Sequence, residues 1–172
     1  YTVMVLCARD DLSLEFRMTN LAIGHQVDGM LLVPSNGFRV TAERMRESGT
    51  PFLALARGID DSSVHQLIGD DLQGGTMAAR HLIEKGCKKL GYFSLNEMPY
   101  STRLRLEGFH RACDEAGIPT GDRFVSVADF RPMEEVLTQW VEKGLDGLCA
   151  FCDSEAWQAM TLLSRHGVKI PD

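Results

Sequence analysis

Residues 27–33 read Val-Asp-Gly-Met-Leu-Leu-Val, and residues 145–151 repeat the pattern as Leu-Asp-Gly-Leu-Cys-Ala-Phe. Each copy follows a helical stretch, turns at Asp-Gly and enters an apolar run that ends in polar residues. Such a run is typical of a strand covered on both faces in a parallel sheet. Two such units, far apart in one chain, predict two similar lobes that present the carboxyl ends of their strands to a shared ligand crevice.

Helical and strand-like segments alternate along the rest of the chain. Apolar residues spaced three and four apart predict helices over 12–25, 41–48, 72–85, 102–116, 133–143 and 154–166. Short apolar runs predict strands over 2–7, 27–33, 51–56, 64–68, 90–93, 124–127 and 148–151. This alternation predicts an α/β fold of parallel sheets flanked by helices.

Glycine residues mark the ends of the predicted helices. Gly49, Gly86, Gly117, Gly144 and Gly167 each close a helical segment, where glycine adopts the left-handed conformation at little cost. The stretch 94–101 has no apolar period and is interpreted as a crossing between lobes. The boundary is therefore expected near residue 97, with an N-terminal lobe over 1–97 and a C-terminal lobe over 98–172.

Composition excludes several classes of protein. The chain has 172 residues, 44% of them hydrophobic, which is enough to bury a core. A formal charge of −6 argues against a nucleic-acid surface on this stretch, because phosphate binding needs clustered Lys and Arg. No apolar run approaches the roughly 20 residues of a membrane span, and no signal segment is recognised. We expect no membrane association.

The five cysteines are scattered and odd in number, which predicts a reducing, cytoplasmic environment rather than a disulfide framework. Cys149 and Cys152 match the Cys-x-x-Cys pattern of redox and metal sites. Residues three apart in a strand point to opposite faces, however, so a buried structural role is favoured for this pair.

The sequence contains only weak matches to motifs of catalytic sites. Asp70 and Asp71 resemble the acidic pair of a magnesium-dependent phosphoryl-transfer site, but an Asp before a helix is more often an N-cap. Gly74 and Gly75 lack the spacing of a nucleotide-phosphate loop. No nucleophile motif is present and the histidines are dispersed. The protein is therefore not expected to be an enzyme, and no metal or cofactor is predicted.

Polar and aromatic side chains follow the ends of the predicted strands. Arginine, carboxylate and hydroxyl groups there can bind hydroxyls or a carboxylate, and an aromatic face can cover an apolar ring. The alternative is ordinary loop chemistry, in which Asp153 only caps a helix and the arginines are solvated. The candidate ligand-binding residues are Ser35, Arg57, Ser101, Arg105, Phe130 and Asp153.

Five segments occur in a characteristic order: Val-Asp-Gly-Met-Leu-Leu at 27–32, Asp-Leu-Gln-Gly-Gly through Glu-Lys-Gly at 71–86, Arg-Leu-Glu-Gly-Phe at 105–109, Asp-Phe-Arg-Pro at 129–132 and Gly-Val-Lys-Ile-Pro-Asp at 167–172. Together they resemble the effector-binding core of LacI/GalR-family bacterial transcription repressors. The resemblance implies a two-lobe periplasmic-binding-protein-like type I fold, incomplete here, with a first strand and helix before Tyr1 and further strands after Asp172.

By matched position, the resemblance implies ligand contacts at Arg57, Ser101, Arg105, Phe130 and Asp153. Two neighbouring positions depart from the family pattern. The family often has Asp at the position of Ala56 and Asn at that of Cys152. Both departures remove a group that binds hydroxyls, which disfavours a simple hexose or pentose as the ligand.

The resemblance also implies a function. A small metabolite is expected to bridge residues 35, 57 and 71 on one side and residues 101, 105, 130 and 153 on the other. Lobe closure would then act on operator DNA through a helix-turn-helix not present in this chain, within a homodimer. The alternatives are a periplasmic solute-binding protein of a sugar transporter, which a signal peptide would distinguish, and a metabolic enzyme on a doubly wound sheet.

Overall fold

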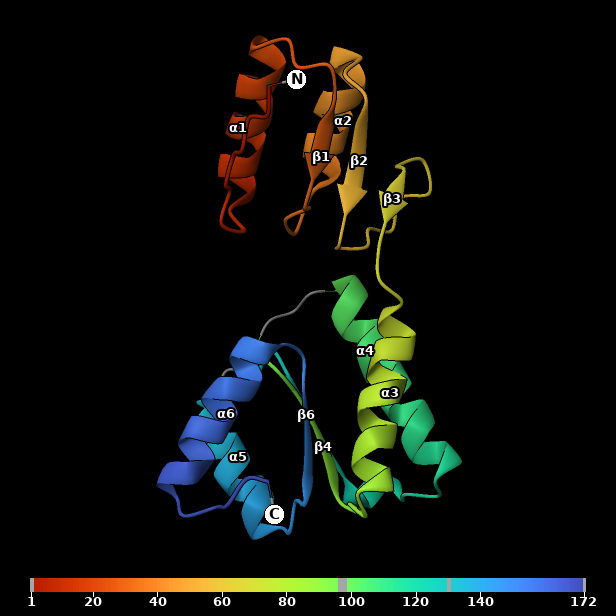
Figure 1. The fold of residues 1–172 in the computed structure, drawn as a ribbon, viewed down its shortest axis with the longest axis vertical. Helices are drawn as coiled ribbons and strands as arrows, with labels where there is room; N and C mark the ends of the chain where they lie inside the picture. The colour runs from red at the N-terminus through yellow and green to blue at the C-terminus, as the bar shows by residue number, and fades with distance from the viewer. Residues whose placement is uncertain (1, 96–98, 130, 172) are drawn as a thin grey trace. The chain divides into compact units, whose positions relative to one another are not determined.

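The computed structural model describes residues 2–95, 99–129 and 131–171, and it divides into two compact units (Figure 1). Unit 1 spans residues 1–69 and unit 2 spans residues 70–172. The repeated Asp-Gly pattern leads into one strand of each unit, as the sequence predicts. None of the described helices is long and apolar enough to cross a membrane.

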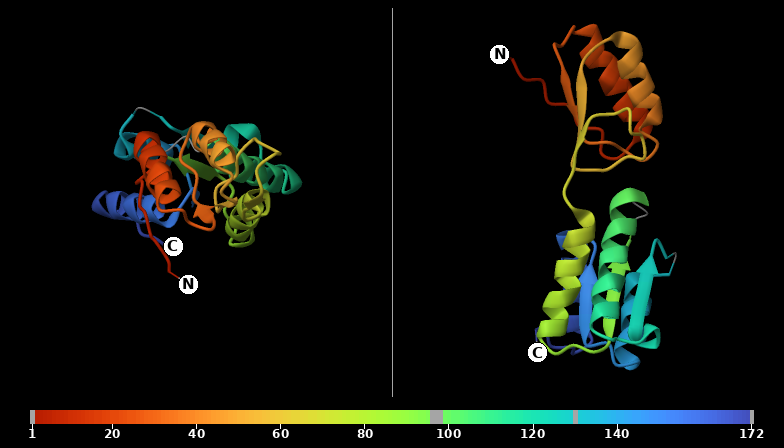
Figure 2. Two further views of the ribbon diagram at one scale, coloured as in Figure 1. Left: turned by 90° about the horizontal axis from the view of Figure 1, so that it is seen from above. Right: turned by 90° about the vertical axis from the view of Figure 1, so that its right-hand side faces the viewer.

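Unit 1 contains a three-stranded parallel sheet in the order β1-β2-β3. Both helices lie on one face of this sheet (Figure 2), and Ala42 of the second helix packs with Phe38, Ala54 and Val64 into a small core. The elements are α1 (Leu12–Gly24), β1 (Met30–Leu32), α2 (Arg39–Ser48), β2 (Phe52–Leu55) and β3 (Gln66–Leu67).

The predicted strand over residues 2–7 is the one predicted element that the structure does not form. Its apolar alternation is present in the sequence, but a strand requires a hydrogen-bonded neighbour. Within the described residues, β1 pairs only with β2, and its other edge has no partner. Val3 and Val5 are therefore exposed.

Unit 2 is a three-layer α/β/α sandwich (Figure 1). Its parallel sheet has the order β5-β4-β6, with α3 and α4 on one face and α5 and α6 on the other. Its elements are α3 (Asp71–Glu84), β4 (Leu90–Ser94), α4 (Pro99–Glu115), a 3-10 turn (Thr120–Asp122), β5 (Arg123–Val127), α5 (Met133–Glu142), β6 (Gly147–Ala150) and α6 (Asp153–Arg165).

The central strand β4 is buried along its whole length and divides the core of unit 2 in two. Leu90 and Tyr92 pack with Phe109 of α4 on one face, whereas Phe93 packs with Trp140 of α5 on the other. Alternate residues of a strand point to opposite faces, so an unbroken apolar run is required here.

The division between the units does not coincide with the boundary expected near residue 97. It lies between Gly69 and Asp70, because β4 pairs with β5 and β6 and because α3 packs along α4. Residues 70–95 therefore belong to unit 2. The five glycines predicted to close helices all have positive φ, between 69° and 95°.

Candidate functional site

The predicted ligand-binding residues fall into two groups, one in each unit. Ser35 and Arg57 follow β1 and β2 in unit 1, whereas Ser101, Arg105 and Asp153 belong to unit 2. Phe130 lies outside the described residues. Each group lies where the strands of its sheet end, which is where parallel sheets place ligand contacts.

In unit 1, Arg57 pairs with Asp10, an acid that was not predicted from the sequence. Its guanidinium forms a two-pronged ion pair with Asp10, in which Nη2 donates to Oδ2 over 3.1 Å, and Nη1 donates to the Pro34 carbonyl over 3.2 Å. This ion pair lowers the pKa of the Asp10 carboxyl. Arg57 therefore has a fixed orientation and a partly compensated charge.

Ser35 is positioned by a second acid, Glu15, whose side chain is 5% exposed. The Ser35 amide donates to Glu15 Oε2 over 2.7 Å, and the Thr41 hydroxyl donates to Oε1 over 2.6 Å. Glu15 lies on the buried stripe of α1 together with Thr19 and Ala22. A charged residue on an otherwise core-facing stripe was the signal that could have revealed it.

In unit 2, Arg105 of α4 connects three elements. Its Nε donates to Oδ1 of Asp71 in α3 over 2.7 Å, and its Nη1 donates to the carbonyl of Phe151, which follows β6. The guanidinium carbon also lies 4.6 Å from the centre of the Phe151 ring, a cation–π contact. The Asp71 side chain is 5% exposed and that of Arg105 is 36% exposed.

The position of Asp71 corrects one expectation. Asp71 was expected on the same side of the ligand as residues 35 and 57, but it belongs to unit 2 and faces Arg105. The favoured N-cap interpretation is confirmed for Asp70, whose carboxylate accepts the Gln73 amide at 2.9 Å. Because Asp70 caps the helix, the Asp71 carboxylate is available for the ion pair.

Two glycines bring α3 and α4 close enough for this ion pair. A Cβ added at Gly75 would overlap the Arg105 carbonyl oxygen, and one added at Gly108 would overlap the Leu72 carbonyl oxygen. The two helix backbones are therefore in direct contact at this crossing. Gly75 therefore has a packing role, against the backbone of α4.

Further polar groups are buried near the end of β4. Glu155 is 2% exposed, and its Oε1 accepts the Leu95 amide at 3.0 Å. Burial raises the pKa of both Glu155 and Tyr92. Among the described residues, Glu155 Oε2, the Tyr92 hydroxyl and Asp71 Oδ2 are buried without a hydrogen-bond partner. Ser101 is also buried, whereas Asp153 is exposed at the start of α6.

The Cys-x-x-Cys segment has no metal-binding geometry. Cys149 is buried in the core of unit 2, whereas Cys152 precedes α6 and its Sγ lies 3.1 Å from Ser154 Oγ. Within the described residues, no group of three or more His, Cys, Asp or Glu side chains could hold a metal ion.

This difference in burial predicts different cysteine reactivity. Burial raises the pKa of the Cys149 thiol to about 12, so we expect it to resist iodoacetamide at pH 8. Cys7 is exposed and should react rapidly under the same conditions. Mass spectrometry before and after denaturation measures both sites. Labelling of Cys149 in the native protein as fast as that of Cys7 would contradict the prediction.

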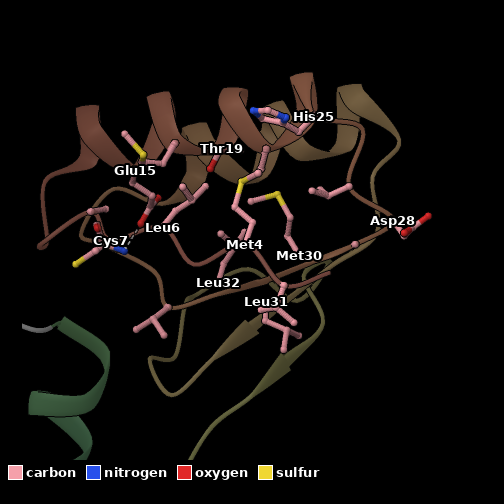
Figure 3. A pocket seen from close by; sticks show the side chains of 18 of the residues that line it. Met4, Leu6, Cys7, Glu15, Thr19, His25, Asp28, Met30, Leu31 and Leu32 are labelled. Atoms are coloured by element: carbon pink, nitrogen blue, oxygen red, sulfur yellow. Dashed lines mark hydrogen bonds between the residues drawn. The ribbon is translucent and has the colours of Figure 1, made fainter. Parts of the chain in front are cut away.

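A groove of about 1040 Å³ lies within unit 1, between β1, α1 and residues 2–9. Figure 3 shows Met4, Leu6, Met30 and Leu32 among the side chains that line it. The groove follows the edge of β1 that has no strand partner among the described residues. It was not predicted from the sequence, because it results from the missing pairing of residues 2–7.

The geometry defines an α/β protein with polar groups at the carboxyl edges of two parallel sheets, an arrangement typical of small-molecule binding proteins. Residues 79–172 match the family described as the periplasmic binding protein-like domain. The chain belongs to this family. The predicted resemblance to the effector-binding core of LacI/GalR-family regulators is also confirmed by the relatives of the chain.

Among the relatives is the HTH-type transcriptional repressor PurR of Actinobacillus pleuropneumoniae, 28% identical over 88% of this chain and 46% of that protein. The HTH-type transcriptional regulator GalR of Escherichia coli is 33% identical over 59% of this chain and 31% of that protein. The chain thus spans about half the length of the first curated relatives it matches.

Solved structures show the same fold. The transcription regulator CcpA of Lactococcus lactis matches with a TM-score of 0.84 and 20% identity, over 99% of this chain and 64% of that one. A LacI family transcriptional regulator from Enterococcus faecium with bound ribose matches with a TM-score of 0.80 and 23% identity, over 98% of this chain and 63% of that one.

Proposed function

We propose that this chain is the effector-binding core of a DNA-binding transcriptional regulator. A small metabolite binds to the polar groups at the carboxyl edges of its sheets, and the resulting change in conformation alters the affinity of the regulator for operator DNA. The proposal includes a helix-turn-helix outside these residues, a homodimeric regulator and a cytoplasmic location. The chain itself has no catalytic role in this proposal.

The observation that carries the proposal is the environment of Arg105. This arginine lies in the Arg-Leu-Glu-Gly-Phe segment of the resemblance, at the carboxyl edge of the sheet in unit 2, and it retains exposed surface. Its guanidinium is held by Asp71 and Phe151, so its orientation is preset before a ligand arrives. Preset donors of this kind are typical of ligand sites rather than of solvated surface arginines.

The proposal is supported by the names of the relatives, which are regulators of transcription. A secreted solute-binding protein is the alternative. The free cysteines argue against it, because exposed Cys7 and partly buried Cys87 and Cys152 would be liable to oxidation outside a reducing compartment.

The test uses the intact protein. Operator DNA is selected from genomic fragments, effectors are found by a thermal-shift screen of metabolites, and both affinities are measured by fluorescence anisotropy. Arg105→Gln should weaken effector binding about 10- to 100-fold, because a charged hydrogen-bond donor contributes roughly 1.5–3 kcal/mol. DNA affinity without effector should be unchanged.

Arg111→Gln is the matched control on the same helix. Arg111 is exposed and pairs with Glu115 one turn away, so its loss should leave effector affinity unchanged. Equal losses in the two variants, or a protein that binds no DNA, would contradict the proposal. Because Ala56 and Cys152 replace hydroxyl-binding groups, we also expect ordinary hexoses and pentoses to give little thermal stabilisation.

A further inference from the structure

Arg105 presents only part of its hydrogen-bonding capacity to a ligand. A guanidinium has five N–H donors. The Nε–H donates to Asp71, and one Nη1–H donates to the Phe151 carbonyl. The Phe151 ring covers one face of the group at 4.6 Å. Three N–H donors remain for a ligand. Their directions are set because the guanidinium contacts Asp71, the Phe151 carbonyl and the Phe151 ring.

Asp71 compensates the charge of Arg105 as well as fixing its orientation. The Nε to Oδ1 distance is 2.7 Å, and the Asp71 side chain is 5% exposed, so water screens this pair weakly. A buried carboxylate needs a partner, and Asp71 Oδ2 has none among the described residues. Arg105 is therefore the charged partner of the Asp71 carboxylate, and the two opposite charges compensate each other.

Two acidic residues follow Phe151 closely in the chain. Asp153 lies in the first turn of α6, two residues after Phe151, and Glu155 follows in the same turn. A phosphate or carboxylate arriving at Arg105 would therefore meet an arginine whose charge Asp71 already compensates.

We propose that Asp71 is a positioning and specificity residue, which fixes the Arg105 guanidinium and cancels its charge so that the site takes uncharged oxygen acceptors and rejects phosphate esters and carboxylates. The acceptors are hydroxyl, ether or carbonyl oxygens of a neutral metabolite. This inference rests on the proposed function and deepens it, because it names the chemical class of the effector.

The first experiment measures the orientation of Arg105 without any ligand. The Nε–H signal of Arg105 is assigned by ¹H–¹⁵N NMR of the intact protein through its disappearance in Arg105→Lys. We expect slow exchange with water in the wild type and at least about tenfold faster exchange in Asp71→Asn, since the charged acceptor is lost. Asp70→Asn is the matched control, because Asn also caps a helix and Asp70 does not contact Arg105.

The second experiment measures charge selection with inorganic phosphate as the probe. Titration should show no saturable binding to the wild type or to Asp70→Asn at millimolar phosphate. Asp71→Asn should bind phosphate at least about tenfold more tightly, because it leaves an uncompensated guanidinium. Saturable phosphate binding to the wild type that is lost in Arg105→Gln overturns the inference, even if Asp71→Asn does not fold.

Unchanged exchange of the Nε–H in Asp71→Asn also overturns the inference. Neither experiment uses DNA or an effector. Failure here therefore leaves the regulator proposal intact, whereas a protein that binds no DNA contradicts the regulator proposal and leaves the neutral Asp71–Arg105 pair unaffected.

Discussion

Gly75→Ala is expected to lower the free energy of unfolding of unit 2 by about 3 kcal/mol or more, because the added Cβ overlaps a backbone carbonyl that cannot move without separating α3 from α4. Gly108→Ala should have a similar effect, since its Cβ overlaps the Leu72 carbonyl. Both tryptophans, Trp140 and Trp157, lie in unit 2, so urea unfolding followed by tryptophan fluorescence reports on this unit.

Gly74→Ala is the control within the same helix. A Cβ at Gly74 meets nothing within 4 Å, and alanine is preferred over glycine inside a helix by about 0.5–1 kcal/mol. This variant should therefore be slightly more stable than the wild type. If Gly75→Ala proved as stable as Gly74→Ala, the close crossing of α3 and α4 would be wrong.

Glu15→Ala is expected to destabilise unit 1 by about 2–4 kcal/mol, because it leaves two buried donors, the Ser35 amide and the Thr41 hydroxyl, without an acceptor. The loss should be visible as faster hydrogen exchange of the Ser35 amide and of amides throughout unit 1. Glu15→Gln retains one side-chain oxygen and should lose less stability.

Glu43→Ala separates this effect from the loss of a surface charge. Glu43 is exposed and pairs with Arg39 one turn away, an interaction worth less than about 0.5 kcal/mol. Exchange of the Ser35 amide should be unchanged in this variant. Similar exchange rates in Glu15→Ala and Glu43→Ala would contradict the role assigned to Glu15.

The helices and most strands could be predicted from the sequence because their signals are local. Helical periodicity and a closing glycine lie within about 15 residues, and all six predicted helices form. The strand over 2–7 failed because pairing requires a neighbour, which no local pattern supplies. The boundary near residue 97 failed for the same reason, since only the pairing of β4 with β5 and β6 assigns it to unit 2.

The same distinction holds for the candidate site. Arg105 and Arg57 could be found because they follow predicted strands or belong to a recognisable segment. Their ion pairs could not be predicted, because Asp71 lies 34 residues from Arg105 and Asp10 lies 47 residues from Arg57. The role of Phe130 and the ligand contacts themselves stay predictions.

The unpaired edge of β1 beside the groove of unit 1 has a practical consequence. A strand edge with no strand partner among the described residues, flanked by exposed Leu31 and Val33, forms a template onto which an extended polypeptide can add. Residues 1–172 handled alone are therefore prone to self-association and aggregation that increase with protein concentration.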